Sequence, residues 1–429
     1  MLERKISNYL KEWKQKKKKK ALLVTGARHT GKTYSIRRFG KEQYTNLVEI
    51  NFLEDKKARE IFAEVSDIRE LITKLTAYIG NSLKAEKTLI FFDEVQACPE
   101  VRNAVKMFVD DGRFDCIEAG FPESSFYYEE VYEMYPLDLE EFLWANGIRE
   151  AAIEYVRECY ELNMKASGSV HEMLKRLFKA YVVVGGMPEA VQAFADTHDM
   201  AQVLEIQKGI LEIFMTDIKT APNIGTNIDR NKMKKIMEFI PSQLNKENKR
   251  FMLADIRKSA RMERYEQCFD SLVDRGMTLP CYNVGEPKNP LKNTQKDNLF
   301  KLYLADSGLL CAMLSENVQF EVLQDNLDIN RGSVLENAMA QILAAHGFVL
   351  RYFNEKNKGE LDFLIQKGTT VIPVEVRAGD DYMNHSALDY VLGNKDWNLK
   401  EGIVFCDRNV EKNGAIRYLP WYMSMFLRA

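Results

Sequence analysis

One short segment constrains the fold of this chain more than any other. Residues 26–33 read GARHTGKT, directly after the apolar segment ALLVT and before YSIRRFG. They match the pattern G-x-x-x-x-G-K-[ST] in its required setting between a strand and a helix. Gly26 and Gly31 let the backbone curl, so that loop amides and the helix N-terminus point at an anion. The sequence therefore predicts an α/β unit with a phosphate-binding loop.

The residue types in the loop indicate binding of a nucleoside triphosphate together with a divalent metal ion. Lys32 is expected to reach the β- and γ-phosphates, and the hydroxyl of Thr33 is the expected direct ligand of Mg²⁺. We therefore predict ATP and Mg²⁺ as the cofactors. The predicted nucleotide-binding residues are Gly26, Ala27, Arg28, His29, Thr30, Gly31, Lys32, Thr33 and Tyr34.

The segment TLIFFDEVQ supplies carboxylates for the same site. Its apolar run is typical of a strand buried on both faces, and it ends at Asp93 and Glu94. Open α/β sheets bind ligands at the carboxyl ends of their strands. We assign Asp93 to the magnesium shell with Thr33. Glu94 is the predicted catalytic residue together with Lys32, because a carboxylate there can orient water, which favours hydrolysis over transfer to a second substrate.

The rest of the chain divides by its patterning. Four apolar segments (ALLVTG, NLVEINF, TLIFFDE, FDCIEAG) alternate with helical ones, as in a parallel sheet. Residues 148–218 have helical patterning broken by GGMP, residues 230–306 suggest three short helices and two strands of a winged helix, and an α/β pattern follows from about residue 332. The expected domains are 1–147 (P-loop core), 148–228 (helical lid), 229–315 (winged helix) and 316–429 (second α/β domain).

Composition limits the function classes. Among 429 residues, 60 Lys and Arg against 63 Asp and Glu give a net charge of -3, so no global field draws the chain to nucleic acid. No run of about 18 apolar residues is present, and the charged N-terminus lacks a signal-peptide core. We expect a cytoplasmic protein without a membrane span. The seven scattered cysteines argue against a disulfide scaffold or a zinc site. The basic run Lys16–Lys20 is either a solvated helix end or a contact for phosphates or anionic lipid.

Further strings carry a resemblance to a known family. They are YPLDLEEFL, GGMPEAV, FKLYLADSGLL, and GELDFLI followed by VEVRAG. With the two nucleotide motifs, the chain resembles a widespread bacterial and archaeal family of AAA+ P-loop ATPases over nearly its whole length. The resemblance implies ATP binding, a winged helix and a C-terminal α/β restriction-endonuclease-like domain of unknown function. With the helical patterning above, the expected α/β fold is a P-loop NTPase core with a helical lid, followed by these two parts. A homo-oligomer is a further expectation.

One position departs from that family. Its members often place Gly-Ser after the next strand, where a small polar side chain senses the γ-phosphate, whereas this chain has Phe121, followed by a shorter loop. We therefore expect slow hydrolysis. Arg102, Arg113 and Arg149 are candidates for an arginine finger by neighbourhood only, and an ordinary surface arginine is the alternative for each.

A locally basic segment lies in the expected winged helix. Residues 229–264 carry 11 basic and five acidic side chains, a local charge of +6. Arg261 and Arg264 are expected to start the recognition helix RMERYEQCFDSLVDRG, which makes DNA a candidate partner. The alternative is a connector whose cations are solvated. The candidate DNA-binding residues are Lys249, Arg250, Arg257, Lys258, Arg261 and Arg264.

The last segment resembles the PD-(D/E)XK nuclease arrangement. Glu336 lies on a predicted helix, Asp362 ends GELD on one strand, and Glu375 with Arg377 forms E-V-R on the next. Carboxylates converging from such elements can bind Mg²⁺, which activates water for phosphodiester cleavage. Arg377 stands where the pattern usually has lysine, and it does not deprotonate near neutrality. Two interpretations stay open, a metal-dependent DNase and a retained fold used for binding or assembly.

Two functions compete for the whole chain. The first is an Mg²⁺-dependent ATPase whose nucleotide state moves the lid and a DNA-facing tail. The second is a signalling or defence switch that binds ATP, hydrolyses it rarely, and contacts a protein or nucleic-acid partner through its C-terminal parts. Glu94 favours the first function, and Phe121 and Arg377 favour the second.

Overall fold

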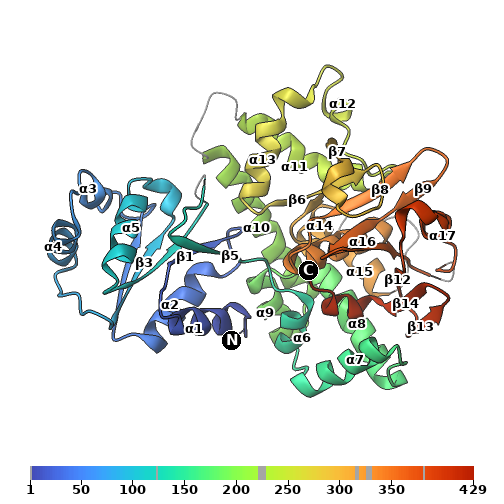
Figure 1. Cartoon of the computed structure of the whole chain (residues 1–429), viewed down its shortest axis with the longest axis horizontal. Helices are drawn as coiled ribbons and strands as arrows, with labels where there is room; N and C mark the ends of the chain where they lie inside the picture. Colours follow the sequence, from blue (N-terminus) through green and yellow to red (C-terminus); the bar gives the residue numbers. More distant parts are fainter. Residues whose placement is uncertain (1, 122–123, 221–228, 315–317, 325–330, 380–381) are drawn as a thin grey trace. The chain divides into compact units, whose positions relative to one another are not determined.

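The computed structural model describes residues 2–121, 124–220, 229–314, 318–324, 331–379 and 382–429. The described chain forms two compact units, each with its own core. The N-terminal unit is Glu3–Tyr135, drawn from blue to cyan in Figure 1. The C-terminal unit is Pro136–Ala429, with which Leu2 is grouped.

The N-terminal unit is built on a fully parallel sheet of order β2-β3-β4-β1-β5. The four strands expected from the apolar segments are confirmed. The fifth was missed, because EEVYE is rich in charge and only alternate residues of this edge strand are covered. The strands are β1 (Ala21–Thr25), β2 (Asn46–Asn51), β3 (Thr88–Asp93), β4 (Asp115–Ala119) and β5 (Glu129–Glu133).

Helices cover both faces of this sheet. On one face α1 and α2 pack against Leu22, Val24 and Phe91, and Ile6, Leu10 and Trp13 of α1 are buried there at the spacing that the sequence predicts. On the other face α3, α4 and α5 pack against Leu23 and Phe92. Alternate residues of β1 and β3 therefore serve two separate cores, which is why both strands are continuously apolar. The helices are α1 (Ile6–Gln15), α2 (Lys32–Gln43), α3 (Arg59–Phe62), α4 (Ile68–Ile79) and α5 (Val101–Asp111).

The C-terminal unit begins with helices, as expected for residues 148–218. Helix α8 ends at Val184 and α9 starts at Pro188, so the GGMP segment is the break between them. A proline at the first position of a helix loses no hydrogen bond, since its amide would have no partner there. The helices are α6 (Leu139–Ala145), α7 (Glu150–Leu162), α8 (Gly168–Val184), α9 (Pro188–Thr197) and α10 (Met200–Thr220).

Short helices and a hairpin follow in the predicted order. Strands β6 and β7 are antiparallel, but β6 also pairs in parallel with β8, so the hairpin belongs to a four-stranded sheet of order β7-β6-β8-β9. The predicted start of the third helix was wrong, because Arg264 closes a 3₁₀ turn over Met262–Arg264 and α13 begins only at Glu266. The elements are α11 (Arg230–Leu244), α12 (Leu253–Ile256), α13 (Glu266–Asp274), β6 (Thr278–Val284), β7 (Gln295–Leu304), α14 (Ser307–Met313) and α15 (Val318–Leu323).

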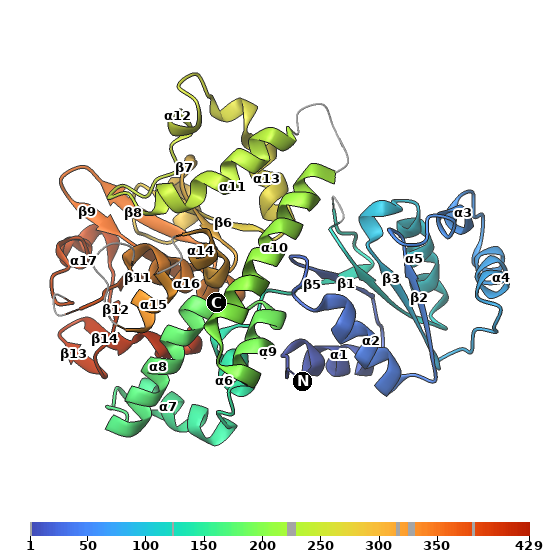
Figure 2. The ribbon, with the colours of Figure 1, turned by 180° about the vertical axis from the view of Figure 1, so that it is seen from behind.

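The last part of the chain forms the second sheet of the C-terminal unit, of order β10-β11-β12-β14-β13, which Figure 2 shows from behind. The single strand expected for GELDFLIQ is in fact two, since the chain leaves one sheet and enters the other at Asp362. The Asp362 carboxylate accepts a hydrogen bond from the Val376 amide at 2.8 Å, which holds the crossing point. The elements are α16 (Arg331–Ala345), β8 (Arg351–Glu355), β9 (Gly359–Leu361), β10 (Phe363–Lys367), β11 (Thr370–Val376), α17 (Ser386–Gly393), β12 (Gly402–Cys406), β13 (Glu411–Asn413) and β14 (Ile416–Pro420).

Two of the strings that carry the family resemblance meet inside this unit. Asp306 of LADSGLL accepts hydrogen bonds from the amides of Gly186 at 2.6 Å and Leu309 at 3.0 Å. A Cβ on Gly185 would lie 2.1 Å from the same carboxylate, so only glycine fits. Burial raises the pKa of Asp306 to about 6. These strings therefore tie the α8–α9 turn to the start of α14 and have a structural role here.

No described helix combines the length and apolar character required to cross a bilayer.

Candidate functional site

The GARHTGKT loop joins β1 to α2 and curls as the motif predicts. Gly26 and Gly31 have φ angles of +121° and +94°, which disfavour other residues. A Cβ at Gly26 would lie 2.1 Å from the Met134 carbonyl oxygen. The Lys32 ammonium, almost buried, donates to the carbonyl oxygens of Gly26 at 2.7 Å and Ala27 at 2.8 Å. The predicted phosphate lysine is thus folded back on its own loop.

The structure brings the two predicted magnesium ligands together. Thr33 Oγ1 donates to Asp93 Oδ2 at 3.0 Å, and Asn51 Nδ2 donates to the same oxygen at 3.2 Å. Burial raises the pKa of Asp93. An adjacent hydroxyl and carboxylate at a helix N-terminus offer the oxygen ligands that Mg²⁺ prefers, so these residues fit the ion. Sequence reasoning missed Asn51, although it ends the strand beside β3 and is in register with Asp93.

The predicted catalytic carboxylate is held by residues close to it in the chain. Glu94 has a left-handed backbone, with φ +57°. Its Oε2 accepts a hydrogen bond from Gln96 Nε2 at 2.5 Å and lies 3.5 Å from the guanidinium of Arg28. Gln96 Oε1 in turn accepts from the Phe121 amide at 3.1 Å. Gln96 was not predicted, although it stands two residues after Glu94.

Phe121 has a definite place in this site. Its ring centroid lies 5.1 Å from the Lys32 ammonium, close enough for a cation–π contact. The side chain therefore covers the lysine at the position where a small polar residue was expected.

The N-terminal segment also contacts the loop. Arg4 donates to the carbonyl oxygens of Thr30 at 2.7 Å and Tyr135 at 2.8 Å. The Thr30 hydroxyl donates to Ala27 O at 2.8 Å, which braces the loop from within. His29 takes a left-handed conformation in the loop, and the Tyr34 side chain is exposed. Because Arg4 is 26 residues from Thr30, no local signal pointed to it.

The arginine-finger candidates differ in their surroundings. Arg102 is buried between the carboxyl groups of Glu118 at 3.2 Å and Glu129 at 2.5 Å, so its guanidinium makes structural contacts inside the N-terminal unit. Burial raises the pKa of Glu118 to about 8, against the opposing effect of Arg102. Arg113 pairs with Asp111 at 2.7 Å, and Arg149 is exposed at the start of α7.

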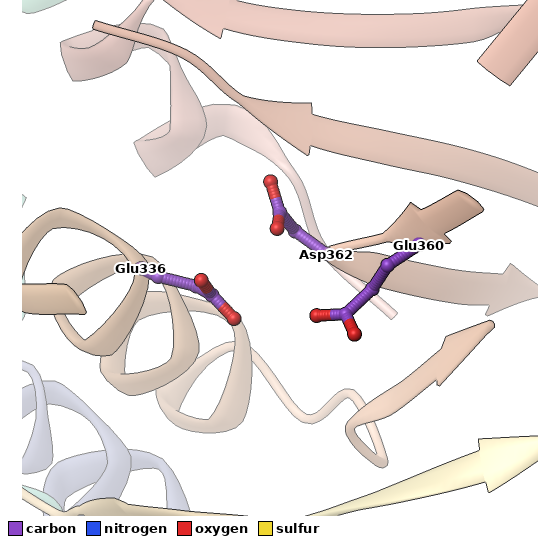
Figure 3. A group of neighbouring side chains, drawn as sticks. All are labelled: Glu336, Glu360 and Asp362. Carbon is purple, nitrogen blue, oxygen red and sulfur yellow. The ribbon is translucent and has the colours of Figure 1, made fainter. Parts of the chain in front are cut away.

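The C-terminal unit holds a second group of carboxylates, which we call the tail cluster (Figure 3). Glu336 of α16, Glu360 of β9 and Asp362 bring one oxygen each within 4.8 Å of one another. The predicted residues Glu336 and Asp362 are thus together, but with Glu360, which was not predicted. Glu375 also lies close to Asp362, and its carboxylate pairs at 2.8 Å with Arg377, which directly follows β11.

Lysine ammonium groups of the protein lie within the tail cluster. The Lys301 ammonium, fully buried, lies 2.8 Å from Glu336 and 2.5 Å from Glu360. Lys249 and Tyr303 also donate to the Glu336 carboxylate. Lys301 and Tyr303 are two residues apart in FKLYL, so their side chains lie on the same face of β7. This spacing was the sequence signal that could have placed both side chains in one site.

The pKa values of these carboxyl groups diverge. Burial by itself would raise the pKa of Glu336, but Lys249 and Lys301 lower it to about 2. Burial raises the pKa of Asp362, and burial with the nearby Asp362 charge raises that of Glu375 well above its usual value. The lysines therefore stabilise the ionised form of Glu336 in particular.

The candidate DNA-binding residues separate into two groups. Lys249 points into the tail cluster and Arg250 is half-buried. The other four (Arg257, Lys258, Arg261 and Arg264) are exposed around α12 and the 3₁₀ turn before α13.

Three family models match separate parts of the chain. Residues 18–143 match an AAA domain. Residues 175–319 match a domain of unknown function (DUF8612), and residues 331–422 match another (DUF4143). The last two matches name neither a winged helix nor a nuclease, which stay predictions.

Three solved structures show weak similarity to this chain. The Walker-type ATPase PABY2304 of Pyrococcus abyssi is 16% identical, with 73% of this chain and 96% of that chain covered and a TM-score of 0.42. The Thermotoga maritima RuvB Holliday junction branch migration motor is 12% identical, with 68% and 91% covered and a TM-score of 0.29. The Aeropyrum pernix Orc1 protein in complex with DNA is 11% identical, with 75% and 90% covered and a TM-score of 0.23. Among curated proteins there is no match.

The family match coincides with the loop and the carboxylates described above. Residues 18–143 include the whole loop, the Thr33–Asp93 contact and Glu94. Residues 18–143 are thus an AAA-type P-loop ATPase domain.

Proposed function

We propose that the N-terminal unit binds ATP with Mg²⁺ and hydrolyses it. The observation that carries the proposal is the 3.0 Å contact between Thr33 and Asp93 beside the curled loop. It joins the two motifs that are 60 residues apart in the chain. The Lys32 ammonium donates hydrogen bonds to two carbonyl oxygens of the loop, and it has the reach and charge to bind phosphate oxygens instead of these carbonyl oxygens.

The remaining roles follow from the groups present. Thr33 and Asp93 would hold Mg²⁺, which supplies neutralisation of phosphate charge when bound. Glu94, at the carboxyl end of β3, would orient a water and accept its proton. Asn51 donates to Asp93 and keeps that carboxylate turned toward Thr33.

The test is ATP turnover with magnesium, combined with nucleotide binding. Glu94→Gln should lower the rate of ATP turnover by about 10²-fold or more while ATP still binds, because the substitution removes only the proton acceptor. Lys32→Ala should weaken ATP binding, and Lys41→Ala, exposed in the last turn of the same helix, serves as the matched control. A wild-type protein that binds ATP without turnover contradicts the hydrolysis proposal.

A second candidate is a slow nucleotide switch whose C-terminal unit binds a partner. It is favoured by Phe121, which covers Lys32 with an apolar ring, and by Lys301, which neutralises the tail cluster from within. In this proposal the exposed cations around α12 contact DNA phosphates and the nuclease-like domain binds without cleaving.

One assay separates the tail functions. ATP turnover is followed with and without single- and double-stranded DNA, and the DNA is run on a gel from the same tube. DNA binding that weakens on Arg261→Ala and with rising salt supports the phosphate contact, with the exposed Lys356→Ala in the turn after β8 as control. Strand cleavage that disappears on Asp362→Ala would establish a nuclease and overturn the binding-only alternative.

A further inference from the structure

We infer that Gln96 is the positioning residue for Glu94. Its side-chain amide supplies the polar group at the end of β4, where Phe121 has an apolar side chain. The inference rests on the proposed ATP hydrolysis and assigns a role to the last residue of TLIFFDEVQ, which had none.

The hydrogen bonds fix the orientation of the Gln96 amide. Gln96 lies in the 3₁₀ turn Val95–Ala97, directly after β3. The backbone amide of Phe121 can only donate, and it does so to Gln96 Oε1 at 3.1 Å. The Nε2 end must therefore face the other way, where it donates to Glu94 Oε2 at 2.5 Å. One side chain thus connects the backbone after β4 to the predicted proton acceptor.

The end of β4 is shaped to receive this amide. Gly120 has φ +148°, and a Cβ there would lie 2.2 Å from Gln96 Oε1. Glycine at this position therefore leaves room for the glutamine. In the sheet β4 lies between β3, which carries the carboxylates, and β1, which leads into the phosphate loop. The Gln96 amide is accordingly at the centre of the candidate site's edge of the sheet.

The hydrogen bond from Gln96 determines which carboxylate oxygen of Glu94 can accept a proton from water. Gln96 and Arg28 both engage Oε2. With that oxygen engaged, the carboxylate plane is set and Oε1 is the oxygen turned to a reacting water. A proton acceptor must stay within hydrogen-bond reach of its water, and a shift of about 1 Å lowers the rate steeply. Movement of the backbone at Phe121 would reach Glu94 through this amide.

Two substitutions separate hydrogen bonding from packing. Gln96→Met fills similar space over Gly120 but removes the amide, and Gln96→Glu keeps an acceptor for the Phe121 amide but replaces the donor to Glu94 by a charge. We expect both to lower kcat by about 10- to 100-fold, part of the contribution of a positioned base, with KM for ATP changed less than about twofold. Gln43→Met, at the far end of α2, is the matched control and should keep wild-type kcat.

A double-mutant cycle tests whether Gln96 acts through Glu94. In single-turnover assays, Gln96→Met should lower the rate of Glu94→Gln by no more than about twofold, because the group it positions is already removed. Full additive losses would overturn the inference, as would an active Gln96→Met protein or one that no longer folds or binds ATP. A wild-type protein without turnover is a different result, which overturns the proposed function itself and the inference with it.

Discussion

The two carboxylate groups of this chain are built from similar residues but have different partners. At the nucleotide site Asp93 and Glu94 accept hydrogen bonds mainly from neutral donors, namely Thr33, Asn51 and Gln96. In the tail cluster the carboxylates face ammonium groups, above all the buried Lys301. Neutral donors orient a carboxylate and leave its charge for a ligand cation, whereas a buried lysine already compensates that charge. The partners of a carboxylate, more than its presence, therefore distinguish the two sites.

The sharpest test of this comparison is removal of the buried ammonium. Lys301→Met leaves the buried Glu336 and the partly exposed Glu360 without their shared cation, and we expect the free energy of unfolding of the C-terminal unit to fall by about 3–5 kcal/mol. The measurement is urea denaturation of the full chain at pH 7. Lys356→Met, exposed in the same unit, should change it by less than about 0.5 kcal/mol. Equal effects of the two substitutions would contradict an internally compensated cluster.

At the nucleotide site the corresponding test concerns backbone shape. Gly26→Ala places a Cβ against the Met134 carbonyl oxygen, and we expect a loss of about 1–3 kcal/mol beyond the effect of backbone strain alone. Gly80→Ala is the control for strain, since Gly80 also has a positive φ but open space around its Cβ. Melting curves and ATP titration check the result. If both variants lose the same stability and bind ATP equally, the Met134 contact has no role.

The buried carboxyl group of Glu118, beside Arg102 in the N-terminal unit, gives a pH-dependent test. The pKa of Glu118 is raised from 4.5 to about 8, so its contribution to stability is complete below the unfolded value and is lost as pH rises through 8. The free energy of unfolding should therefore decline from pH 5 to pH 9. Glu118→Gln, neutral throughout, should flatten that decline, measured by denaturation at each pH. A variant with the wild-type slope would assign the dependence to other groups.

The smallest expected effect comes from the outer lysine of the tail cluster. Lys249 contacts Glu336 but remains partly exposed, so water replaces the ammonium when it is removed. We expect Lys249→Met to lower the free energy of unfolding by about 1 kcal/mol, well below the effect of Lys301→Met. The same urea series checks the ranking. A reversed order would mean that Lys249, and not Lys301, is the main counter-ion.

Particular residues show how far the sequence could be interpreted. The parallel strands and the curled loop follow from local patterns, since continuous apolar runs and G-x-x-x-x-G-K-T act over a few residues. Strand β5 was missed because an edge strand needs only one covered face. The break at Asp362 was missed because GELDFLIQ reads as one strand until the partners of its two halves are known.

The phosphate loop, the carboxylates at the end of β3, and Glu336 and Asp362 of the tail cluster could be predicted from local sequence patterns. The residues that surround them could not, because they depend on the tertiary fold. Arg4 at the loop, Asn51 beside Asp93 and Lys301 among the carboxylates come from segments far from their partners in the chain. Local patterns follow from backbone geometry within one element, whereas charge compensation depends on which side chains the fold brings within about 3 Å.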